Sequence, residues 1–529
     1  MIKDLARLGA NASVSTEVLI IGGGIAGLLL AVKLREHDVP VVILESGGPG
    51  NDAQPHPLNE VLQLGRVYRG ALEGRARGLG GTSALWGGAL IPFLAEDMQA
   101  RPHAGVVAWP VGLDSVAPHV DALERLFGLD KGAFDERFVT DCKPRLPIPV
   151  GDTDFIARFA KWPAFGRRNV ATLFRKRIES DPGLTVFLNA TVTSFALDES
   201  AGRLAGAQAS HAGGNSVRVV AQRVVVCAGA IEATRLLLLL DRQTHGRAFA
   251  GCDALGRYFH DHVSARAADI VTSRPLQLNR LAGFRFAAST MRSLRFELTP
   301  GAQQTAGVGS AFGHISFQAI DASGFDHLRA LLRNLQRTRR IDLDAAAKLA
   351  IDAPYLVRAA YWRYVHKQLR WPEPAVYELH IVAEQKPKPE NRIVLAEQTD
   401  SLGVPRVAVD WRIAPDDCAT IGAYASHFDA YWKRHKLDGL GRLDWAPGIR
   451  DGSGASIEQI GDVFHPGGTT RMGSNAREAV VDGNLNTFAI ANLWVASTSV
   501  FPSGASANPT MMLMLFTLRL ADHLAKASR

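Results

Sequence analysis

The chain has 529 residues, of which 47% are hydrophobic and 21% are charged, as is typical of globular proteins. A chain of this length forms about two or three domains with large cores, so disordered, collagen-like, coiled-coil and disulfide-stabilised classes are excluded. The four cysteines are widely separated and form no CxxC pair, which favours buried thiols over disulfides or a metal site.

The formal net charge of +7 comes mainly from residues 325–371, which contain ten Lys or Arg and four Asp or Glu. No nucleic-acid-binding motif accompanies this stretch, so we expect no nucleic-acid partner. It predicts a basic helical insert that carries several aromatic side chains. Two interpretations stay open: a solvated helical hairpin packed on its parent domain, or a docking surface for an acidic protein or another anionic surface.

Membrane and export signals are missing from the sequence. Its apolar stretches are shorter than the roughly 18 residues that a membrane-spanning helix needs. Residues 1–16 contain neither an apolar signal core nor a twin-arginine pair. We therefore expect no transmembrane segment and a cytoplasmic location. Export together with a signal-bearing partner subunit would leave no trace in this sequence.

The first predicted elements form a β-α-β unit: a strand over 17–21, a glycine turn, a helix over 28–37 and a strand over 41–44. Such a unit binds dinucleotides, because the N-terminus of the helix attracts the pyrophosphate. The pattern alone does not separate NAD from FAD.

Each glycine of the turn has its own expected role. Gly22 permits the tight turn, Gly24 lets the backbone approach a pyrophosphate, and Gly27 lets the helix pack on the strand. Glu45 follows the second strand, where an acidic side chain accepts hydrogen bonds from the ribose hydroxyls of adenosine.

A second glycine cluster occupies residues 78–88 and includes Gly80-Gly81-Thr82-Ser83 and Trp86-Gly87-Gly88. It lacks the alternation of a strand and holds too much glycine for a helix. We expect a loop pressed against a bound partner, with a purely structural Ω-loop as the alternative.

The middle of the chain predicts further elements of two kinds. A helix is expected over 114–128, and a small-residue strand-to-helix turn over 228–235 suggests that one domain is assembled from separated segments. Strands are also expected over 184–189, 192–197 and 217–226, between these two elements. Alternating strands of an antiparallel kind are expected over 312–320, 377–385 and 407–413.

Two polar side chains lie in small-residue loops near the C-terminus: His465, and Asn508 just ahead of an apolar helix over 511–524. An isolated histidine is more often structural than catalytic, yet its ordinary pKa near 6.5 suits it to accept the proton of an alcohol. Asn508 can donate and accept hydrogen bonds beside it. The pair is therefore a candidate site for an alcohol group.

A histidine-rich segment in the middle of the chain contains His260, Asp261 and His262. These residue types can bind a metal, but their context favours a structural loop near the candidate site. We expect no metal ligand here.

Taken together, these motifs resemble those of the glucose–methanol–choline (GMC) family of flavoprotein oxidoreductases. The resemblance runs the length of the chain, and the combination is specific although no single motif is. The motifs are Gly22-x-Gly24-x-x-Gly27, Gly80-Gly81-Thr82-Ser83 with Trp86, Ala228-Gly229-Ala230-Ile231-Glu232-Ala233-Thr234, Leu255-Gly256-Arg257 to Asp261-His262, Glu384-Gln385 to Pro389 with Asn391-Arg392, and the block from His465 to Thr510.

This resemblance implies a bound FAD. Its adenosine would lie at Gly22–Glu45 with a backbone contact at Val192, and its isoalloxazine against 83–88 and 508–510. Leu85 stands where some members attach FAD covalently through a histidine, so we expect non-covalent FAD. The implied cofactor-binding residues are Gly22, Gly24, Ile25, Ala26, Gly27, Glu45, Gly81, Ser83, Trp86, Gly87, Val192, Ala228, Gly229, Asn508 and Thr510.

The resemblance also implies the reaction. His465 matches the usual base for the substrate hydroxyl, while hydride passes from carbon to flavin N5. Asparagine, as at Asn508, occurs in the branches that resemble pyranose, cholesterol and choline oxidases. The sequence looks nearest to pyranose-oxidase-like and bacterial sugar dehydrogenase members. We expect oxidation of an alcohol, on a sugar, glycoside or polyol, to a ketone or aldehyde, with O2 or another electron acceptor.

The expected fold class is α/β and α+β: a Rossmann-like FAD-binding domain from separated segments, and a substrate-binding domain with a mostly antiparallel sheet and helices. The former covers 1–100, 180–265 and 456–529, and the latter 101–179 and 266–455. Alternatives are a flavin-containing lyase or decarboxylase on the same fold and a non-catalytic flavoprotein docking subunit. A nicotinamide dehydrogenase is a weaker alternative.

Overall fold

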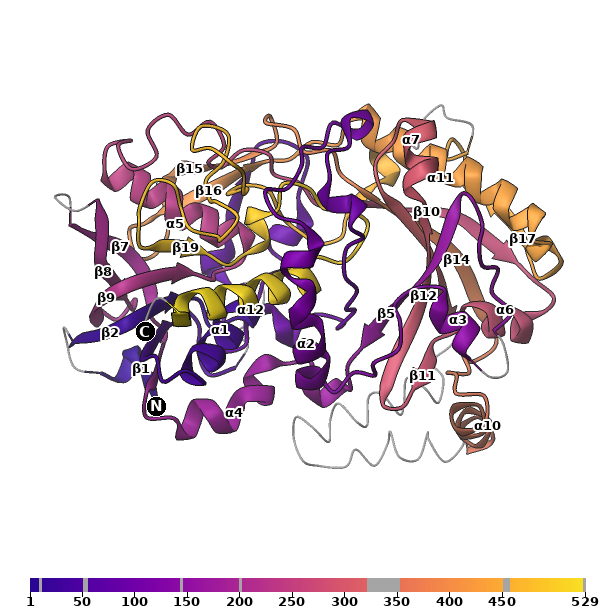
Figure 1. Ribbon diagram of the computed structural model, residues 1–529, viewed down its shortest axis with the longest axis horizontal. Coiled ribbons are helices and arrows are strands. Elements are labelled where there is room, and N and C mark those ends of the chain that lie inside the picture. Colours follow the sequence, from indigo (N-terminus) through magenta and orange to yellow (C-terminus); the bar gives the residue numbers. More distant parts are fainter. Residues whose placement is uncertain are drawn as a thin grey trace.

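The computed structural model describes residues 1–8, 12–50, 56–142, 146–198, 202–320, 353–450 and 457–526. Within these ranges the strands form two eight-stranded sheets and one three-stranded sheet. The two large sheets belong to two units that lie side by side, with both ends of the chain in the first unit (Figure 1). The predicted fold class is confirmed.

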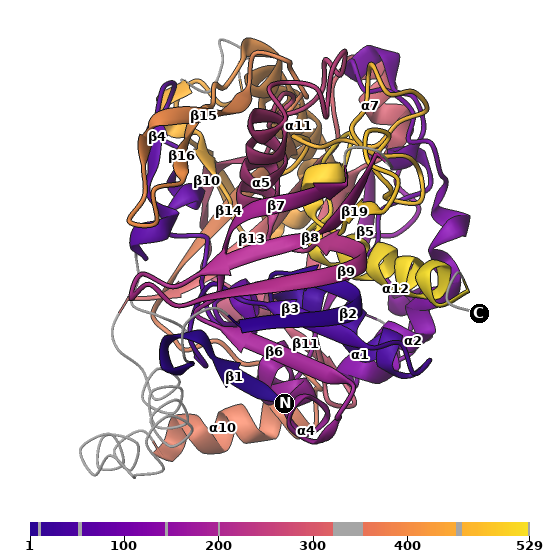
Figure 2. The same cartoon turned by 90° about the vertical axis from the view of Figure 1, so that its left-hand side faces the viewer.

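The first sheet has the strand order β1-β6-β3-β2-β9-β8-β7, and β19 pairs with β9 (Figure 2). Strands β1, β6, β3, β2, β9 and β19 run parallel, whereas β7 and β8 are antiparallel to their neighbours. The bounds are β1 Ile2–Asp4, β2 Ala12–Ile21, β3 Val41–Leu44, β6 Leu184–Leu188, β7 Thr191–Asp198, β8 Arg203–Ser210, β9 Ser216–Val226 and β19 Leu493–Val495.

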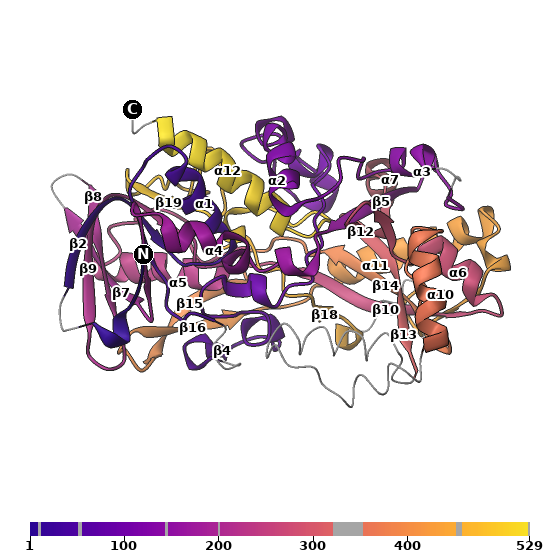
Figure 3. The same ribbon diagram turned by 90° about the horizontal axis from the view of Figure 1, so that it is seen from below.

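Helices cover the parallel part of this sheet, so its central strands are apolar on both faces. α1 (Ile25–Arg35) packs against both α4 (Val170–Ser180) and α12 (Thr510–Lys526), which Figure 3 shows along one side of the unit. α1 is apolar on all sides because it lies between the sheet and these helices. α5 (Ala230–Gln243) contacts β7 and the small third sheet.

The second sheet has the order β11-β12-β13-β14-β10-β17, with β5 paired to β12 and β18 to β10, and all its pairs are antiparallel. Its strands are β5 Phe155–Trp162, β10 His262–Val271, β11 Arg285–Ala287, β12 Thr290–Leu298, β13 Ala311–Ala319, β14 Ala375–Glu384, β17 Arg442–Trp445 and β18 Gly461–Asp462. The helices of this unit include α3 Arg137–Asp141, α6 Pro275–Ala282, α7 Pro300–Ala306, α10 Ala353–Tyr364 and α11 Pro415–Arg434, while α2 is Val120–Phe127.

The two faces of the second sheet differ in polarity. On one face, Leu379 and Ile381 of β14 join the apolar core under α11. The alternate residues of each strand point to the other face. Arg295 of β12 belongs to that polar face and donates a hydrogen bond to Asn508, which precedes α12 of the first unit. The polar face is therefore the one that meets the first unit.

The third sheet differs from the sequence-based expectation. Its strands are β4 Val61–Gln63, β15 Arg392–Thr399 and β16 Pro405–Asp410. The strand predicted over 407–413 forms as β16 and pairs antiparallel with β15, as expected, but these strands lie in a separate small sheet, where β16 also pairs in parallel with β4 and contacts α5. Alternation of polar and apolar residues fixes which face of a strand is buried and does not specify its partner strand.

Other elements also depart from the predictions. The helix expected over 114–128 is regular only as α2, because Pro118 lies in a short 3-10 turn ahead of it and cannot enter a helix interior. Of the predicted basic insert, residues 325–352 lie outside the described part of the chain. α10 follows them and lies near α6 (Figure 3). No helix in the described ranges is both long and apolar enough to cross a membrane.

A buried ion pair joins the two units. Glu384 ends β14, and both of its carboxylate oxygens accept hydrogen bonds from the guanidinium of Arg101, at 2.6 and 2.8 Å. The same carboxylate accepts the backbone N–H of Ala505 (2.9 Å), in the loop before α12. Burial opposes the charge of Glu384, but Arg101 and the hydrogen bonds outweigh it and lower the pKa of Glu384 to about 2.

Gly27, at the start of α1 where the helix meets β2, should not tolerate a side chain. A Cβ on Gly27 would lie 1.9 Å from the backbone oxygen of Gly22, and backbone cannot move aside cheaply. We expect Gly27→Ala to lower the free energy of unfolding by about 3 kcal/mol or more, measured by urea denaturation. Gly166→Ala is the control, because nothing lies within 4 Å of a Cβ there. Equal stability of the two variants would contradict this packing.

Replacing Glu384 should unfold the protein more easily, because it leaves the guanidinium of Arg101 buried without its partner. We expect Glu384→Ala to cost about 3–5 kcal/mol in urea denaturation. Glu179→Gln, in an exposed pair with Arg175, is the control and should change little.

The same ion pair predicts a pH dependence of stability. The pKa of Glu384 is lower in the folded than in the unfolded chain, so its contribution is complete above about pH 4.5 and is lost as the pH falls toward about 2. Urea denaturation between these pH values should show a steeper loss for the wild type than for Glu384→Gln. Parallel pH curves would show that this carboxylate is not held in its charged form.

Candidate active site

A glycine turn joins β2 to α1 at the edge of the first sheet. α1 begins at Ile25 and no side chain caps its N-terminus, so its first N–H groups can bind an anion. Gly80 donates its N–H to the oxygen of Gly23 (2.8 Å), and a Cβ on Gly81 would lie 3.0 Å from the Cα of Gly24. The second glycine cluster therefore packs directly on the first turn.

Glu45 ties these two glycine segments together. Its buried carboxylate accepts the backbone N–H groups of Gly23 (2.7 Å), Gly47 (2.8 Å) and Gly78 (3.1 Å). Burial raises the pKa of Glu45, and the three hydrogen bonds act in the opposite direction. Besides any contact with a ribose, Glu45 has a structural task in this fold.

A cavity of about 550 Å³ lies between these elements and the C-terminal loops. Its volume falls within the range of cofactor and ligand sites. The cavity reaches from Glu45 and the start of α1 to the histidine and asparagine of the C-terminal loops. Most of the predicted site residues line it: Gly22, Gly24, Ile25, Ala26, Glu45, Gly81, Trp86, Gly87, Ala228, Gly229, His465, Asn508 and Thr510.

Three predicted residues do not line this cavity. Gly27 packs α1 on β2, as its predicted role requires. Ser83 is buried, and its hydroxyl donates to the oxygen of Gly80 (2.6 Å) and accepts from the N–H of Val170 (3.1 Å). Val192 is buried in β7, within the core of the first unit. Both of these hydrogen bonds of the Ser83 hydroxyl are therefore made within the protein.

Two arginines that the sequence analysis missed also line the cavity. Arg77 donates to the Ser46 hydroxyl (2.7 Å) and forms an ion pair with Glu232 (3.0 Å). Burial, together with Arg77, lowers the pKa of Arg75 to about 9. Both arginines directly precede the second glycine cluster, and basic residues beside a glycine-rich loop are a signal for phosphate binding that could have identified them.

His465 and Asn508 meet at the other end of the cavity. The side-chain nitrogen of Asn508 lies 3.3 Å from Nε2 of His465. Burial, followed by the nearby His262 and Arg295, lowers the pKa of His465 well below its ordinary value. His465 is therefore neutral at physiological pH, and one of its ring nitrogens carries a lone pair that can accept a proton.

Arg295 reaches this pair from β12 of the second unit. Its guanidinium donates to the side-chain oxygen of Asn508 (2.6 Å) and lies 3.9 Å from the ring centre of Phe312. Burial lowers the pKa of Arg295 to about 10, so it stays charged at neutral pH. The sequence offered no local signal for it, because it is one charged residue within a strand that belongs to no motif.

Asp261 and His262 lie directly behind His465. The carboxylate of Asp261 accepts the backbone N–H groups of His262 (2.6 Å) and His465 (2.9 Å) and the hydroxyl of Tyr68 (2.6 Å). Burial raises the pKa of Asp261 to about 7 against these hydrogen bonds. Potential ligand atoms of Asp261, His262 and His465 lie within 4.8 Å of one another, but hydrogen bonds already engage each of them.

His260, the remaining residue of this segment, points elsewhere. Its ring nitrogen Nδ1 lies 3.1 Å from the carbonyl oxygen of Tyr258, and its backbone pairs with Gly467. This is the structural role that the sequence analysis favoured for the residue.

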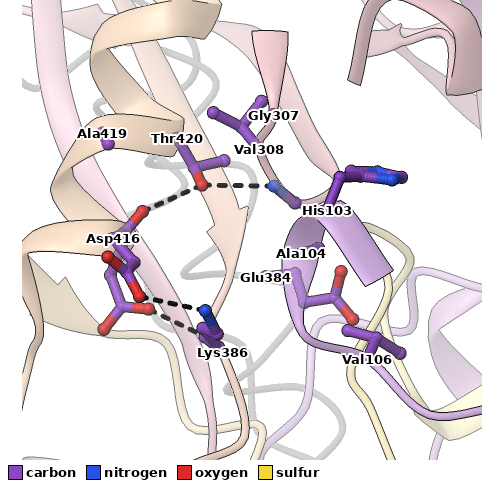
Figure 4. A pocket seen from close by; sticks show the side chains of 12 residues that line it. His103, Ala104, Val106, Gly307, Val308, Glu384, Lys386, Asp416, Ala419 and Thr420 are labelled. Carbon is purple, nitrogen blue, oxygen red and sulfur yellow. Dashed lines mark hydrogen bonds and ion pairs between the residues drawn. The ribbon is translucent and has the colours of Figure 1, made fainter. Parts of the chain in front are cut away.

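A second cavity, of about 150 Å³, lies on the far side of Glu384 (Figure 4). Its polar side chains already have partners: Lys386 pairs with Asp416 at 3.1 Å, Glu384 pairs with Arg101, and the Thr420 hydroxyl accepts the N–H of Gly309. Figure 4 shows the ring of His103 turned away from its centre. The lining of this cavity holds no histidine paired with an amide, as His465 is with Asn508.

Comparison with protein families agrees with this geometry. Residues 387–517 match the model of the GMC oxidoreductase family, and residues 20–63 match a Rossmann-like NAD(P)-binding domain. The first match contains His465 and Asn508, and the second contains the glycine turn and Glu45.

Relatives cover nearly the whole chain. The large subunit of fructose dehydrogenase from Gluconobacter japonicus is 23% identical, over 97% of this chain and 98% of its own. Paromamine 6'-oxidase from Streptomyces fradiae is 22% identical, over 96% and 91%. Among solved structures, pyridoxine 4-oxidase from Mesorbium loti has a TM-score of 0.55 at 17% identity, over 96% of this chain and 99% of its own.

Formate oxidase shares the fold to the same extent, with a TM-score of 0.56 and 15% identity over 98% of this chain and 99% of its own. The family match, the dinucleotide-binding turn and the shared fold all agree with the resemblance found in the sequence. Residues 387–517 therefore form a GMC oxidoreductase C-terminal domain, and the protein is an FAD-dependent oxidoreductase.

Proposed function

We propose that the protein oxidises an alcohol group of a sugar, glycoside or polyol to a carbonyl group, with His465 as the base. The observation that carries this proposal is the neutral, buried His465 held beside Asn508 at the cavity. The names of its relatives support the substrate class. They include a fructose dehydrogenase subunit, a 2-methyl-1,2-propanediol dehydrogenase from Mycolicibacterium austroafricanum and a paromamine 6'-oxidase.

The residues that line the large cavity fit FAD. The uncapped N-terminus of α1 offers N–H groups to the pyrophosphate, and Gly24 and Gly81 line the cavity there without side chains that would block its approach. Glu45 stands at the adenosine end, where a carboxylate disfavours an extra phosphate on the ribose. When bound, FAD supplies the acceptor for the hydride from the substrate carbon.

His465 and Asn508 then act on the substrate oxygen. The free ring nitrogen of His465 takes the hydroxyl proton, and the amide of Asn508 holds the oxygen beside it. Arg295 fixes the amide through its oxygen and places a positive charge near the alkoxide that develops. The proton ends on His465, and O2 or another acceptor takes up the electrons to complete turnover.

Within this proposal, residues 1–100, 180–265 and 456–529 bind FAD, and residues 101–179 and 266–455 bind the substrate. The helix α4 departs from these bounds, because it packs on α1 in the first unit. A cytoplasmic location and an acidic partner at the basic insert stay predictions. The greater part of that insert lies outside the described residues.

An anaerobic titration tests the reaction. We expect one class among sugars, glycosides, polyols and simple alcohols to bleach the flavin absorbance. His465→Ala should slow this bleaching by about 10²–10⁴-fold, the usual contribution of a general base, and Asn508→Ala by less. His103→Ala, at the second cavity, is the control and should bleach at the wild-type rate. A bound flavin that no alcohol bleaches would favour a lyase or a docking subunit.

Release of the cofactor tests how it is held. Because Leu85 lines the cavity where a covalent attachment is expected in some relatives, acid precipitation should leave all the FAD in the supernatant. Absorbance of supernatant and pellet measures the two fractions. Yellow colour that stays with the pellet would show a covalent bond, with Cys227 and His465 as the nucleophiles of the lining to examine.

A further inference from the structure

We propose that His262 is a positioning residue for this reaction: it fixes the tautomer of His465 that leaves Nε2 free to accept the substrate proton. This inference rests on the proposed function. It concerns a residue that does not line the cavity and acts only through His465. The inference follows from four hydrogen bonds: His262 to Ala505, His262 to His465, Arg295 to Asn508 and Asn508 to His465.

The first hydrogen bond settles the state of His262. Its Nε2 lies 2.7 Å from the carbonyl oxygen of Ala505. A carbonyl oxygen only accepts, so Nε2 of His262 carries a hydrogen. Burial lowers the pKa of His262 to about 4, so the ring is neutral at physiological pH and has one N–H. Its Nδ1 therefore carries a lone pair.

The second hydrogen bond determines which ring nitrogen of His465 carries the hydrogen. The Nδ1 atoms of His262 and His465 lie 3.1 Å apart, with the rings nearly perpendicular. Because Nδ1 of His262 can only accept, Nδ1 of His465 must donate. A neutral His465 has only one N–H, which leaves Nε2 of His465 with a lone pair.

The remaining two hydrogen bonds agree with this assignment from the opposite side. Arg295 has only donors, so its 2.6 Å contact identifies the atom of Asn508 that it touches as the amide oxygen. The amide nitrogen of Asn508 is then the atom that lies 3.3 Å from Nε2 of His465. It donates, and Nε2 accepts. The substrate hydroxyl competes for the same lone pair.

The surroundings of His262 explain why it keeps this orientation. Asp261 accepts the backbone N–H groups of both His262 and His465, which holds the two rings in register. Ala505, whose carbonyl anchors His262, is itself held by Glu384. Among the described residues, the charged and titratable groups around the ring pair are Asp261 with Tyr68, Arg295, the Arg101–Glu384 ion pair and the buried ring of His260. When His465 takes the proton, His262 still accepts from its Nδ1–H and stabilises the cation.

Two substitutions test the two ring nitrogens of His262 separately: Nδ1, which accepts from His465, and Nε2, which donates to Ala505. Asn at position 262 can present an oxygen where Nδ1 stood, so His262→Asn keeps an acceptor for His465. Gln can place an N–H where Nε2 stood, so His262→Gln keeps the bond to Ala505 and loses the acceptor. We expect flavin reduction to slow by about 10–100-fold in His262→Gln and by less than about 3-fold in His262→Asn, within what general-base catalysis supplies.

The pH profile distinguishes this role from a structural one. A wrong tautomer is as unreactive at high pH as at neutral pH, so the deficit of His262→Gln should persist to about pH 9. A deficit that disappears at high pH would mean that only the pKa of His465 had changed, which overturns the tautomer assignment. His260→Asn is the matched control, since its ring bonds Tyr258 instead, and it should keep the wild-type profile.

A second readout is independent of turnover. In 15N-histidine-labelled holoprotein, the ring signals absent from His465→Ala belong to His465. We expect Nδ1 of His465 to be protonated in the wild type and in His262→Asn, and this preference to be lost in His262→Gln. Protonation at Nε2 in the wild type would overturn the inference. The expected tautomer in a protein whose flavin no alcohol reduces would instead refute the proposed function and leave the assignment standing.

Discussion

The position of the catalytic groups depends on one buried ion pair, Arg101 with Glu384. Glu384 ends the middle strand of the second sheet, and its carboxylate also holds the backbone N–H of Ala505 ahead of α12. The carbonyl of the same Ala505 anchors His262, and Asn508 follows three residues later. One charged contact therefore holds β14 to the loop that contacts His262 and leads to Asn508, the proposed partner of His465. Burying such a pair is costly unless further hydrogen bonds satisfy its polar atoms. Here the carboxylate of Glu384 also accepts the backbone N–H groups of Ala505 and Ser310, whereas the Nε–H of Arg101 has no partner among the described residues.

The charge distribution around His465 follows from this arrangement. A carboxylate in direct contact with its ring would favour the protonated form. The ring instead meets a neutral histidine, while the carboxylate of Asp261 binds only backbone N–H groups and the Tyr68 hydroxyl. Arg295 adds a positive charge on the side of the substrate oxygen. In the proposed reaction, these contacts would keep His465 neutral beforehand and favour negative charge on the substrate oxygen during hydride transfer.

The sequence allowed prediction of features with local causes. The turn from Gly22 to Gly27 and the acid at Glu45 follow from backbone constraints within one β-α-β unit, and the structure places them together. The loops of His465 and Asn508 were recognisable because small residues surround a polar side chain. Their proximity could not be derived from spacing, since it results from the packing of α12 and its preceding loop.

Features with non-local causes were not predictable. Arg295 and Trp162 lie in ordinary strands of the second unit, and they reach the first unit only because of how the sheets face each other. The strand β16 pairs antiparallel with β15, as expected, but its place in a separate sheet with β4 was not predictable, because its pattern of apolar residues specifies burial and leaves its partner open. Val192 and Ser83 were carried over from a family pattern, and here they lie in the core or bond to backbone.

The packing of α1 against α12 has a consequence for synthesis of the chain. α1 (Ile25–Arg35) precedes α12 (Thr510–Lys526) by most of the sequence, so the apolar surface between them closes only after α12 has been synthesised. At about 5–20 residues per second, α1 waits on the order of 25–100 s for its partner. During that interval the apolar face of α1 that α12 covers in the folded protein lacks its partner helix.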